Sequence, residues 1–246
     1  MTMAAVFAMP GTAVADSATF GSTLQASQSV SVLNQSALQL STAAPVQLVA
    51  PARGLITNWA VRSGDAGTQY ELAVIHHATP GSLSGSVKAI DIAFPPVPDA
   101  SDSIRPYNAG SQVVVDKGDS IALATVAGPG ALPFHNSGNT GDVYGTYGGG
   151  VFSPGTGLGP PAQGTGRELL VQATEHFCSV PALRGLTRAI AQQQLFNHGC
   201  GSSFRKRGVR KRRKRGKVLS QDIAPGTDAL PQTIVHLVIG KKRKHH

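Results

Sequence analysis

The sequence has few of the residues that mark several large classes of protein. Its 246 residues include 2 cysteines, 1 tryptophan and 5% aromatic residues. Two cysteines are too few for a structural zinc site unless histidines complete it. No apolar run reaches the length of about 18 residues that predicts a transmembrane helix. The low aromatic content and the 29 glycines favour a turn-rich β protein over a helical bundle.

Basic residues are missing from the N-terminal region, where the first is Arg53. The apolar segment before Asp16 ends in Ala13-Val14-Ala15, the small-x-small pattern of a signal-peptidase site. This segment is short and has no positively charged start. We interpret residues 1–15 as a truncated signal peptide, with the true start upstream, in preference to an Ala-rich disordered leader. On this interpretation the protein is extracellular or cell-wall associated.

Charge divides the chain at Cys178. Before Cys178 the sequence has 6 Lys/Arg and 11 Asp/Glu, and from Cys178 onward it has 16 and 2, which gives the net charge of +9. Such asymmetry indicates two units with different surfaces. We therefore predict a leader over 1–15, a β-sandwich domain over 16–177, a small α+β domain over 178–240 and a basic tail over 241–246.

The segment 16–177 predicts an antiparallel β-sandwich of jelly-roll type, entered through a Ser/Gln/Ala-rich leader after Ala15. Residues 116–119, Asp-Lys-Gly-Asp, predict a tight hairpin. The Gly/Pro-rich stretch 153–166 is expected to hold no regular structure. Strands are predicted over 46–49, 54–61, 70–75, 86–94, 112–115, 120–126, 143–152 and 169–173.

Two strands of this segment carry patterns of their own. The first contains Gly54, Ile56, Trp59, Val61 and Arg62, and the second contains Lys117, Gly118, Asp119, Ile121 and Leu123. In these patterns the segment resembles the secreted β-sandwich domains of actinobacteria, and the resemblance assigns no functional residue. The expected roles of the sandwich are a carbohydrate-binding module, an adhesion module or a spacer, and its sequence does not choose among them.

The C-terminal segment predicts one helix packed on a three-stranded sheet. Thr187 is a natural N-cap, and Gly199 stands where a left-handed residue ends a helix. Ala191 and Leu195 share the helix face of Thr187. Strands are expected over 204–209, 217–221 and 234–239, the first two forming a hairpin with residues 210–215 at its tip.

Cys178 and Cys200 bracket this helix. A structural disulfide is favoured in an exported chain, whereas in the cytosol these would be two buried free thiols. Closing a loop of this size contributes about 3 kcal/mol in the chain-entropy model. In so small a module that contribution could decide whether the core folds.

The same segment carries a set of apolar, turn and capping residues in a characteristic order. They are Val180, Pro181, Gly185, Leu186, Thr187, Ala191, Leu195, Gly199, Gly216, Val218, Gln221, Pro225, Gly226, Thr227, Val235 and Leu237. In this order and spacing the segment resembles a PASTA domain, the small repeat attached to penicillin-binding proteins and bacterial Ser/Thr kinases. Arg188, Ile223 and Gln232 depart from the family pattern, which commonly has an apolar residue, a proline and a glycine there.

The resemblance implies a secreted, non-enzymatic protein that binds peptidoglycan stem peptides or glycan fragments. A basic block within the module predicts attachment to a polyanion, such as an anionic wall polymer, anionic lipid headgroups or nucleic acid. The alternative is a solvated charged surface without a ligand. The block consists of Arg205, Lys206, Arg207, Arg210, Lys211, Arg212, Arg213, Lys214, Arg215 and Lys217.

The remaining polar residues predict neither a metal nor a cofactor, and we expect no enzyme. His76 and His77 are adjacent and would face opposite sides of a strand. His198 beside Cys200 is the best metal candidate, at a helix end where a histidine is ordinary. The carboxylate pairs lie in turn-like contexts, and no nucleophile, base and orienting group occur as a set. An enzyme with its site on the sandwich loops remains a third hypothesis.

Overall fold

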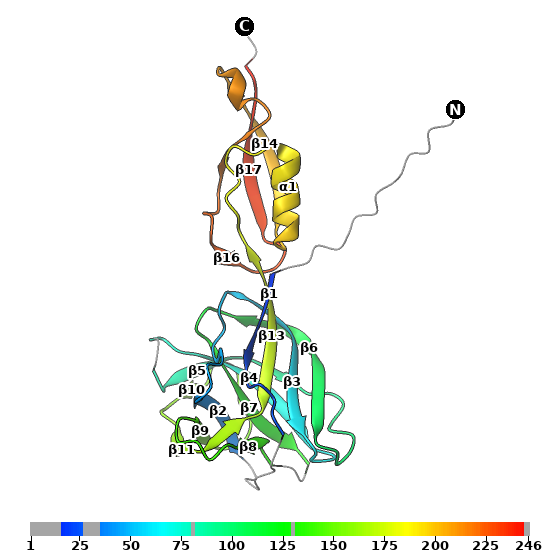
Figure 1. Ribbon diagram of the computed structural model, residues 1–246, viewed down its shortest axis with the longest axis vertical. Helices are drawn as coiled ribbons and strands as arrows, with labels where there is room; N and C mark the ends of the chain where they lie inside the picture. The colour runs from blue at the N-terminus through cyan, green and yellow to red at the C-terminus, as the bar shows by residue number, and fades with distance from the viewer. Residues whose placement is uncertain (1–15, 27–34, 80–81, 129–130, 244–246) are drawn as a thin grey trace, which may run out of the picture. The chain divides into compact units, whose positions relative to one another are not determined.

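The computed structural model describes residues 16–26, 35–79, 82–128 and 131–243 (Figure 1). The chain divides into two compact units, one of residues 17–176 and one that begins at Phe177 and also includes Asp16. The leader interpretation of residues 1–15 lies outside the described residues. Within the described residues, no helix is both long enough and apolar enough to span a membrane.

The two-sheet unit, residues 17–176, is mostly β, as the sequence predicts. Its sheets have the strand orders β1-β13-β3-β6 and β10-β5-β4-β7-β2-β9-β11, and neighbouring strands whose register is defined are antiparallel. Two short strands, β8 and β12, pair separately. The bounds are β1 (Asp16–Gly21), β2 (Gln35–Ser41), β3 (Gly54–Ser63), β4 (Gln69–His76), β5 (Gly85–Ile92), β6 (Ser103–Val115), β7 (Ser120–Ala127), β8 (Phe134–Asn136), β9 (Val143–Gly148), β10 (Gly157–Leu158), β11 (Ala162–Thr165), β12 (Arg167–Leu169) and β13 (Val171–Ser179).

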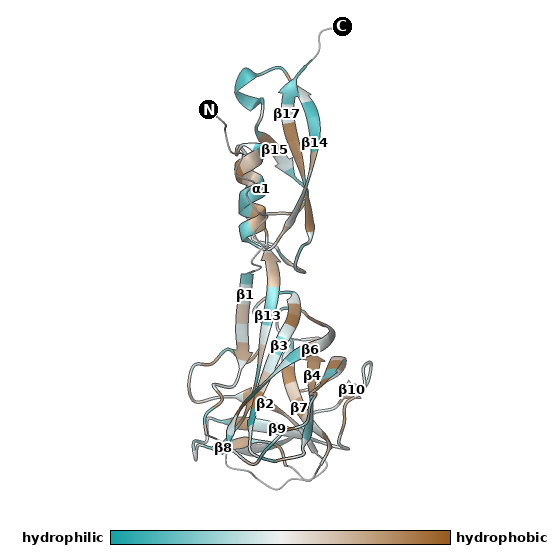
Figure 2. Cartoon of the chain, turned by 90° about the vertical axis from the view of Figure 1, so that its right-hand side faces the viewer, coloured by the Kyte–Doolittle hydropathy of each residue, from teal (hydrophilic) through white to brown (hydrophobic). Residues whose placement is uncertain are grey.

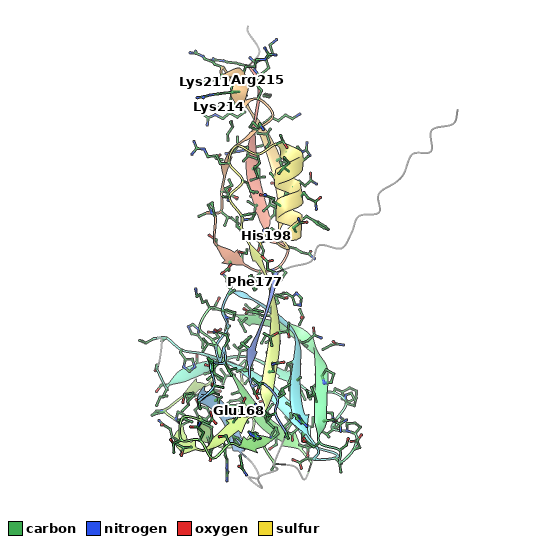
Figure 3. All side chains as sticks on the ribbon, in the orientation of Figure 1. Glu168, Phe177, His198, Lys211, Lys214 and Arg215 are labelled. Atoms are coloured by element: carbon green, nitrogen blue, oxygen red, sulfur yellow. A yellow bond between two sulfur atoms is a disulfide. The ribbon has the colours of Figure 1, made fainter. Side chains whose placement is uncertain are left out.

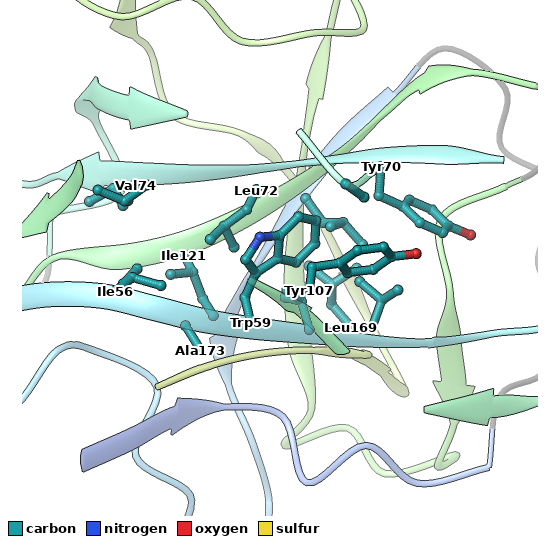
Figure 4. Close-up of a cluster of buried hydrophobic side chains, with 14 of the residues drawn as sticks. Ile56, Trp59, Tyr70, Leu72, Val74, Tyr107, Ile121, Leu169 and Ala173 are labelled. Atoms are coloured by element: carbon teal, nitrogen blue, oxygen red, sulfur yellow. The ribbon is translucent and has the colours of Figure 1, made fainter. Parts of the chain in front are cut away.

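Side chains from both sheets form one core around Trp59 (Figure 4). A bulge in β3 between Ile56 and Asn58 shifts the alternation by one residue, so Trp59 is buried and Asn58 is exposed. The indole Nε1 donates a hydrogen bond to Asp91 Oδ2 at 2.7 Å, which satisfies the polar atom of this buried ring. Tyr107 packs on the indole with ring centroids 4.9 Å apart.

Two predictions about loops of this unit are wrong. The turn at residues 116–119 exists, because Asp119 N donates to Asp116 O at 3.0 Å and Gly118 has φ 92°. However, β6 and β7 belong to different sheets, so the turn connects the sheets and is no hairpin. The stretch 153–166 contains β10 and β11, which pair through their backbones with β5 and β9 at the sheet edges.

Two predictions about strands near the N-terminus are also wrong. The segment after Ala15 is no leader, because β1 and β2 each belong to one of the sheets. The expected strand at 46–49 is reduced to a single bridge between Val49 and Ser120. The apolar alternation of β2 is weak because Ser36 and Gln39 are buried along with Ala37 and Leu38.

The C-terminal unit has one helix on a three-stranded sheet, as expected. Its elements are α1 (Arg188–Asn197), β14 (Gly201–Val209), the 3-10 helix η1 (Arg212–Lys214), β15 (Val218–Gln221), β16 (Asp228–Ala229) and β17 (Ile234–Lys242). The Thr187 hydroxyl accepts a hydrogen bond from Ile190 N at 3.4 Å, and Gly199 has φ 67° at the helix end. Ala191 and Leu195 of the helix share a core with Leu237 of the sheet.

The predicted hairpin in this unit is wrong, because the strand order is β14-β17-β15. β14 runs parallel to β17 and β15 runs antiparallel to it. The last strand therefore takes the centre of the sheet, and its Val235 and Leu237 are fully buried (Figure 2). The expected tail also begins too early, since Lys241 and Lys242 belong to β17. Gln232 has φ 62°, in the left-handed region that favours glycine.

The predicted disulfide is confirmed. It joins Cys178 to Cys200, with Cα atoms 4.9 Å apart and a sequence separation of 22. Cys178 lies on the part of β13 that pairs with β16, and Cys200 directly follows the turn after α1. The bond therefore ties the entry of the unit to the end of its helix, and both cysteines belong to its core.

The double variant Cys178→Ala/Cys200→Ala is expected to destabilise the C-terminal unit by about 3 kcal/mol, because the unfolded chain regains the entropy of an open loop. Trp59 is the only tryptophan and is buried in the two-sheet unit, so its fluorescence reports that unit alone. In urea, the far-UV dichroism of the variant should show an earlier transition while the fluorescence midpoint stays unchanged. A fluorescence midpoint that shifts equally would contradict the independence of the two cores.

Candidate functional site

The basic block lies on β14, on the turn that follows it and at the start of β15. Arg205, Lys206 and Arg207 belong to β14, and residues 210–217 lead through η1 to β15. All ten cations are exposed except Lys217, which is half-buried. Figure 3 labels Lys211, Lys214 and Arg215 on the turn.

Seven cations line a hollow of about 610 Å³, which we call the large hollow. This volume lies within the range of ligand sites in proteins. Val209, Val218 and Leu219 add apolar surface, and no acidic residue lines it. The seven cations are Arg184, Arg207, Arg210, Lys211, Arg213, Lys214 and Lys217.

A second hollow of about 340 Å³, the small hollow, is lined by Arg205, Lys206, Arg207, Ser220 and Val238. It shares Arg207 and Ser220 with the large hollow. The two hollows together contain all the predicted cations except Arg212 and Arg215.

The ten cations have no acidic partner among the residues that the structure describes. Asp222 is close in sequence, but its Oδ1 accepts hydrogen bonds from the backbone N atoms of Ile223 and His236, at 2.9 and 2.8 Å. Like charges held together without counter-charges create a positive potential that attracts anions. Because the cations are exposed, salt will screen that attraction.

Sequence reasoning missed two residues of this site. Arg184, which precedes the helix, reaches the large hollow because Gly185 N donates to Val218 O at 2.9 Å and holds this loop beside β15. Gly240 supports the turn, since a Cβ there would meet the carbonyl oxygen of Lys214. Gly216 N donates to Gly240 O at 2.8 Å, and Gly240 N donates to Lys217 O at 3.0 Å. No local pattern in the sequence signals either residue.

The parallel register also brings Ser203 beside His236, two residues that are 33 apart in sequence. The hydroxyl of Ser203 contacts Nδ1 of the imidazole. A hydrolytic triad would need a carboxylate on the imidazole ring. Asp222, the carboxylate at this position, accepts from the backbone N of His236 instead, so it does not orient the ring.

In the two-sheet unit, His76, Asp116 and Asp119 offer ligand atoms within 4.8 Å of one another. The ammonium group of Lys88 already lies among them, 2.6 Å from Asp116 Oδ2 and 3.1 Å from Asp119 Oδ2. A metal ion would have to displace it. Asp119 is buried and also accepts from Asp116 N at 2.8 Å, the backbone role expected of a turn aspartate.

The hydrogen bond from Lys88 lowers the pKa of Asp116, and the charges of Lys88, Arg53 and His76 add to this effect against a smaller opposing effect of burial. The cluster is therefore an ion-pair network that joins β4, β5 and the turn between the sheets. The sequence does not predict this network, because His76, Lys88 and the aspartates lie on β4, on β5 and in the turn, which are far apart in the chain.

The other candidate residues have structural partners. Cys200 is in the disulfide, which removes the thiolate that a metal beside His198 would need. Glu168 accepts from the hydroxyl of Ser22 at 2.8 Å, and Glu175 accepts from Ala52 N at 3.1 Å. Burial raises the pKa of Glu71, which accepts from a backbone N–H.

Comparison of the chain with protein-family models, curated proteins and solved structures found no match. The fold and the site define a mostly-β, disulfide-bonded protein with a separate basic unit in which α1 packs on the three-stranded sheet β14-β17-β15.

Lys88→Met is expected to destabilise the two-sheet unit by about 1 to 3 kcal/mol, because it leaves the buried Asp119 without its ammonium partner. The lowered pKa of Asp116 stabilises the native state above the ordinary value of 3.8, and this contribution is lost as pH falls through the lowered native value. Urea unfolding followed by Trp59 fluorescence measures the free energy of unfolding. The difference in this free energy between wild type and variant should therefore be largest at neutral pH and decrease at acidic pH.

The matched control is Lys117→Met, because Lys117 is exposed and lies between Asp116 and Asp119 in the turn. Its effect should stay within about 0.5 kcal/mol. Equal losses in the two variants, or a difference that does not change with pH, would refute the assigned role of Lys88.

Proposed function

We propose that this is a secreted, non-enzymatic protein whose PASTA-like C-terminal unit attaches it to the cell wall, through peptidoglycan or another anionic wall polymer. The observation that carries the proposal is the large hollow, where seven cations converge with no acidic residue between them. Arginine forks and lysine ammonium groups both bind carboxylate and phosphate groups.

Two further observations support the proposal. Disulfides persist in oxidising compartments outside the cytoplasm, and the C-terminal unit has its only two cysteines joined. The residues that resemble the PASTA family also occupy structural positions in this unit, among them the N-cap Thr187 and the core residues Ala191 and Leu195.

Wall polymer is a better partner than nucleic acid for this surface. Proteins that hold single strands stack bases on exposed aromatic rings. Phe204 is the aromatic residue of β14, and it packs against the core with the guanidinium of Arg188 4.4 Å above its ring. The two-sheet unit then has the role of a spacer, an adhesion module or a carbohydrate-binding module of jelly-roll type.

Sedimentation of the full chain with purified sacculi tests the proposal. A cation near an anionic surface contributes about 1 kcal/mol, so neutralising four of them should weaken binding at least about tenfold. The affected variant carries glutamine in place of Arg184, Arg210, Arg213 and Lys214. The control with the same net charge, expected to keep most of the binding, carries glutamine in place of Arg212, Arg215, Lys241 and Lys242.

Sacculi stripped of their anionic polymers separate the two wall ligands, since only peptidoglycan remains in them. Binding should decrease with salt as counterions compete. If neither form of sacculi binds while duplex DNA binds with a steep salt dependence, the cell-wall assignment fails and a nucleic-acid role replaces it.

A further inference from the structure

We infer that the large and small hollows form one continuous track for a linear phosphodiester polymer, and that Gly240 keeps this track in one piece. The inference rests on the proposed function and names the chemistry of the ligand. It concerns the shape of the site as well as its charge.

The register of the sheet makes the track continuous. Arg205 of β14 and Ser220 of β15 both pair with Val238 of β17, so these three residues lie side by side across the three strands. Side chains of paired residues point to the same face of a sheet. Leu237 and its alternate neighbours on β17 face the helix core, so Val238 and its partners occupy the opposite face. Arg207 lies two residues beyond Arg205 on this face and lines both hollows.

Gly240 brings the turn onto the same face. It pairs with Arg207 and lies two residues after Val238, so its missing side chain would point to the face of the track. That space is taken by the backbone of Lys214, whose carbonyl oxygen a Cβ would meet. The turn that carries Arg213 and Lys214 therefore folds over the end of β17 and forms a wall of the large hollow.

The residues of the track select the chemistry of the polymer. Arg205, Arg207 and Arg213 each present a planar fork that matches two phosphate oxygens, and Ser220 adds a hydroxyl. Two hollows of about 610 and 340 Å³ that share residues suit a chain of repeated anionic groups better than one small anion. No aromatic residue lines either hollow, so the track lacks stacking partners for bases. A thin polyol phosphodiester chain fits these features.

The test measures binding of the full chain to poly(glycerol phosphate) of defined lengths at fixed salt. Gly240→Ala leaves the net charge unchanged and displaces the turn, so it should weaken binding of long chains at least about tenfold. The control is Gly159→Ala, because Gly159 lies outside both hollows and no atom lies within 4 Å of a Cβ added there. Its affinity should equal that of the wild type.

Arg205→Gln provides a second measurement that does not disturb the turn. Because Arg205 lines only the small hollow, its loss should weaken long chains, which occupy both hollows, more than glycerol phosphate, which the large hollow can also hold. Far-UV dichroism and closure of the disulfide show whether Gly240→Ala folds. If it does not fold, the dependence of the Arg205→Gln effect on ligand length tests whether the two hollows form one track.

Several results would overturn the inference. Wild-type affinity in Gly240→Ala would show that charge alone binds the polymer. An Arg205→Gln effect that is equal for long and short ligands would show that the hollows act separately. Tighter binding of single-stranded DNA with the same number of phosphates would reject the polyol chain. Failure with sacculi alongside success with poly(glycerol phosphate) would instead reject the cell-wall function and leave the track standing.

Discussion

The alternation of β17 is the constraint on which the C-terminal unit depends. Val235, Leu237 and Ile239 point toward the helix and form a core with Ala191 and Leu195. β14 and β15 pair with this strand on its two sides, so it lies at the centre of the sheet. The same alternation then directs every second residue of β14 to the opposite face, where arginines lie with their charges in solvent. The apolar core and the basic surface are thus two sides of one pairing pattern.

The local features of this unit could be predicted from sequence because each depends on neighbouring residues. The roles of the N-cap threonine and of the glycine that ends the helix follow from the residues directly around them. The disulfide follows from the position of the two cysteines on either side of one helix. The partner of a strand is a different kind of information. Nothing in 204–221 shows that a strand from the C-terminal end will lie between its two halves. The same limit applies to the turn at 116–119: its residues predict a turn, but they do not show that the two strands it joins belong to different sheets.

Eight of the ten predicted cations line the two hollows, and they could be predicted as a group because they lie within residues 205–217. The shape of the site could not. It depends on Arg184, which lies before the helix, and on Gly240, whose importance comes from the backbone folded against it. In the stretch 153–166 the sequence predicts no strand where the structure has two. Short edge strands need only backbone hydrogen bonds, so they carry no sequence pattern of their own.

The order of strands in the first sheet has a consequence for how the protein is made. β13, the last strand of the two-sheet unit, lies between β1 and β3. Among the described residues, β1 therefore has no neighbour in that sheet until residue 171 and those after it have been synthesised. Contacts between such distant parts of a chain form slowly. A chain that is still bound to the ribosome therefore lacks the strand that completes this sheet, and β1 stays unpaired in the sheet until synthesis of the unit is nearly finished.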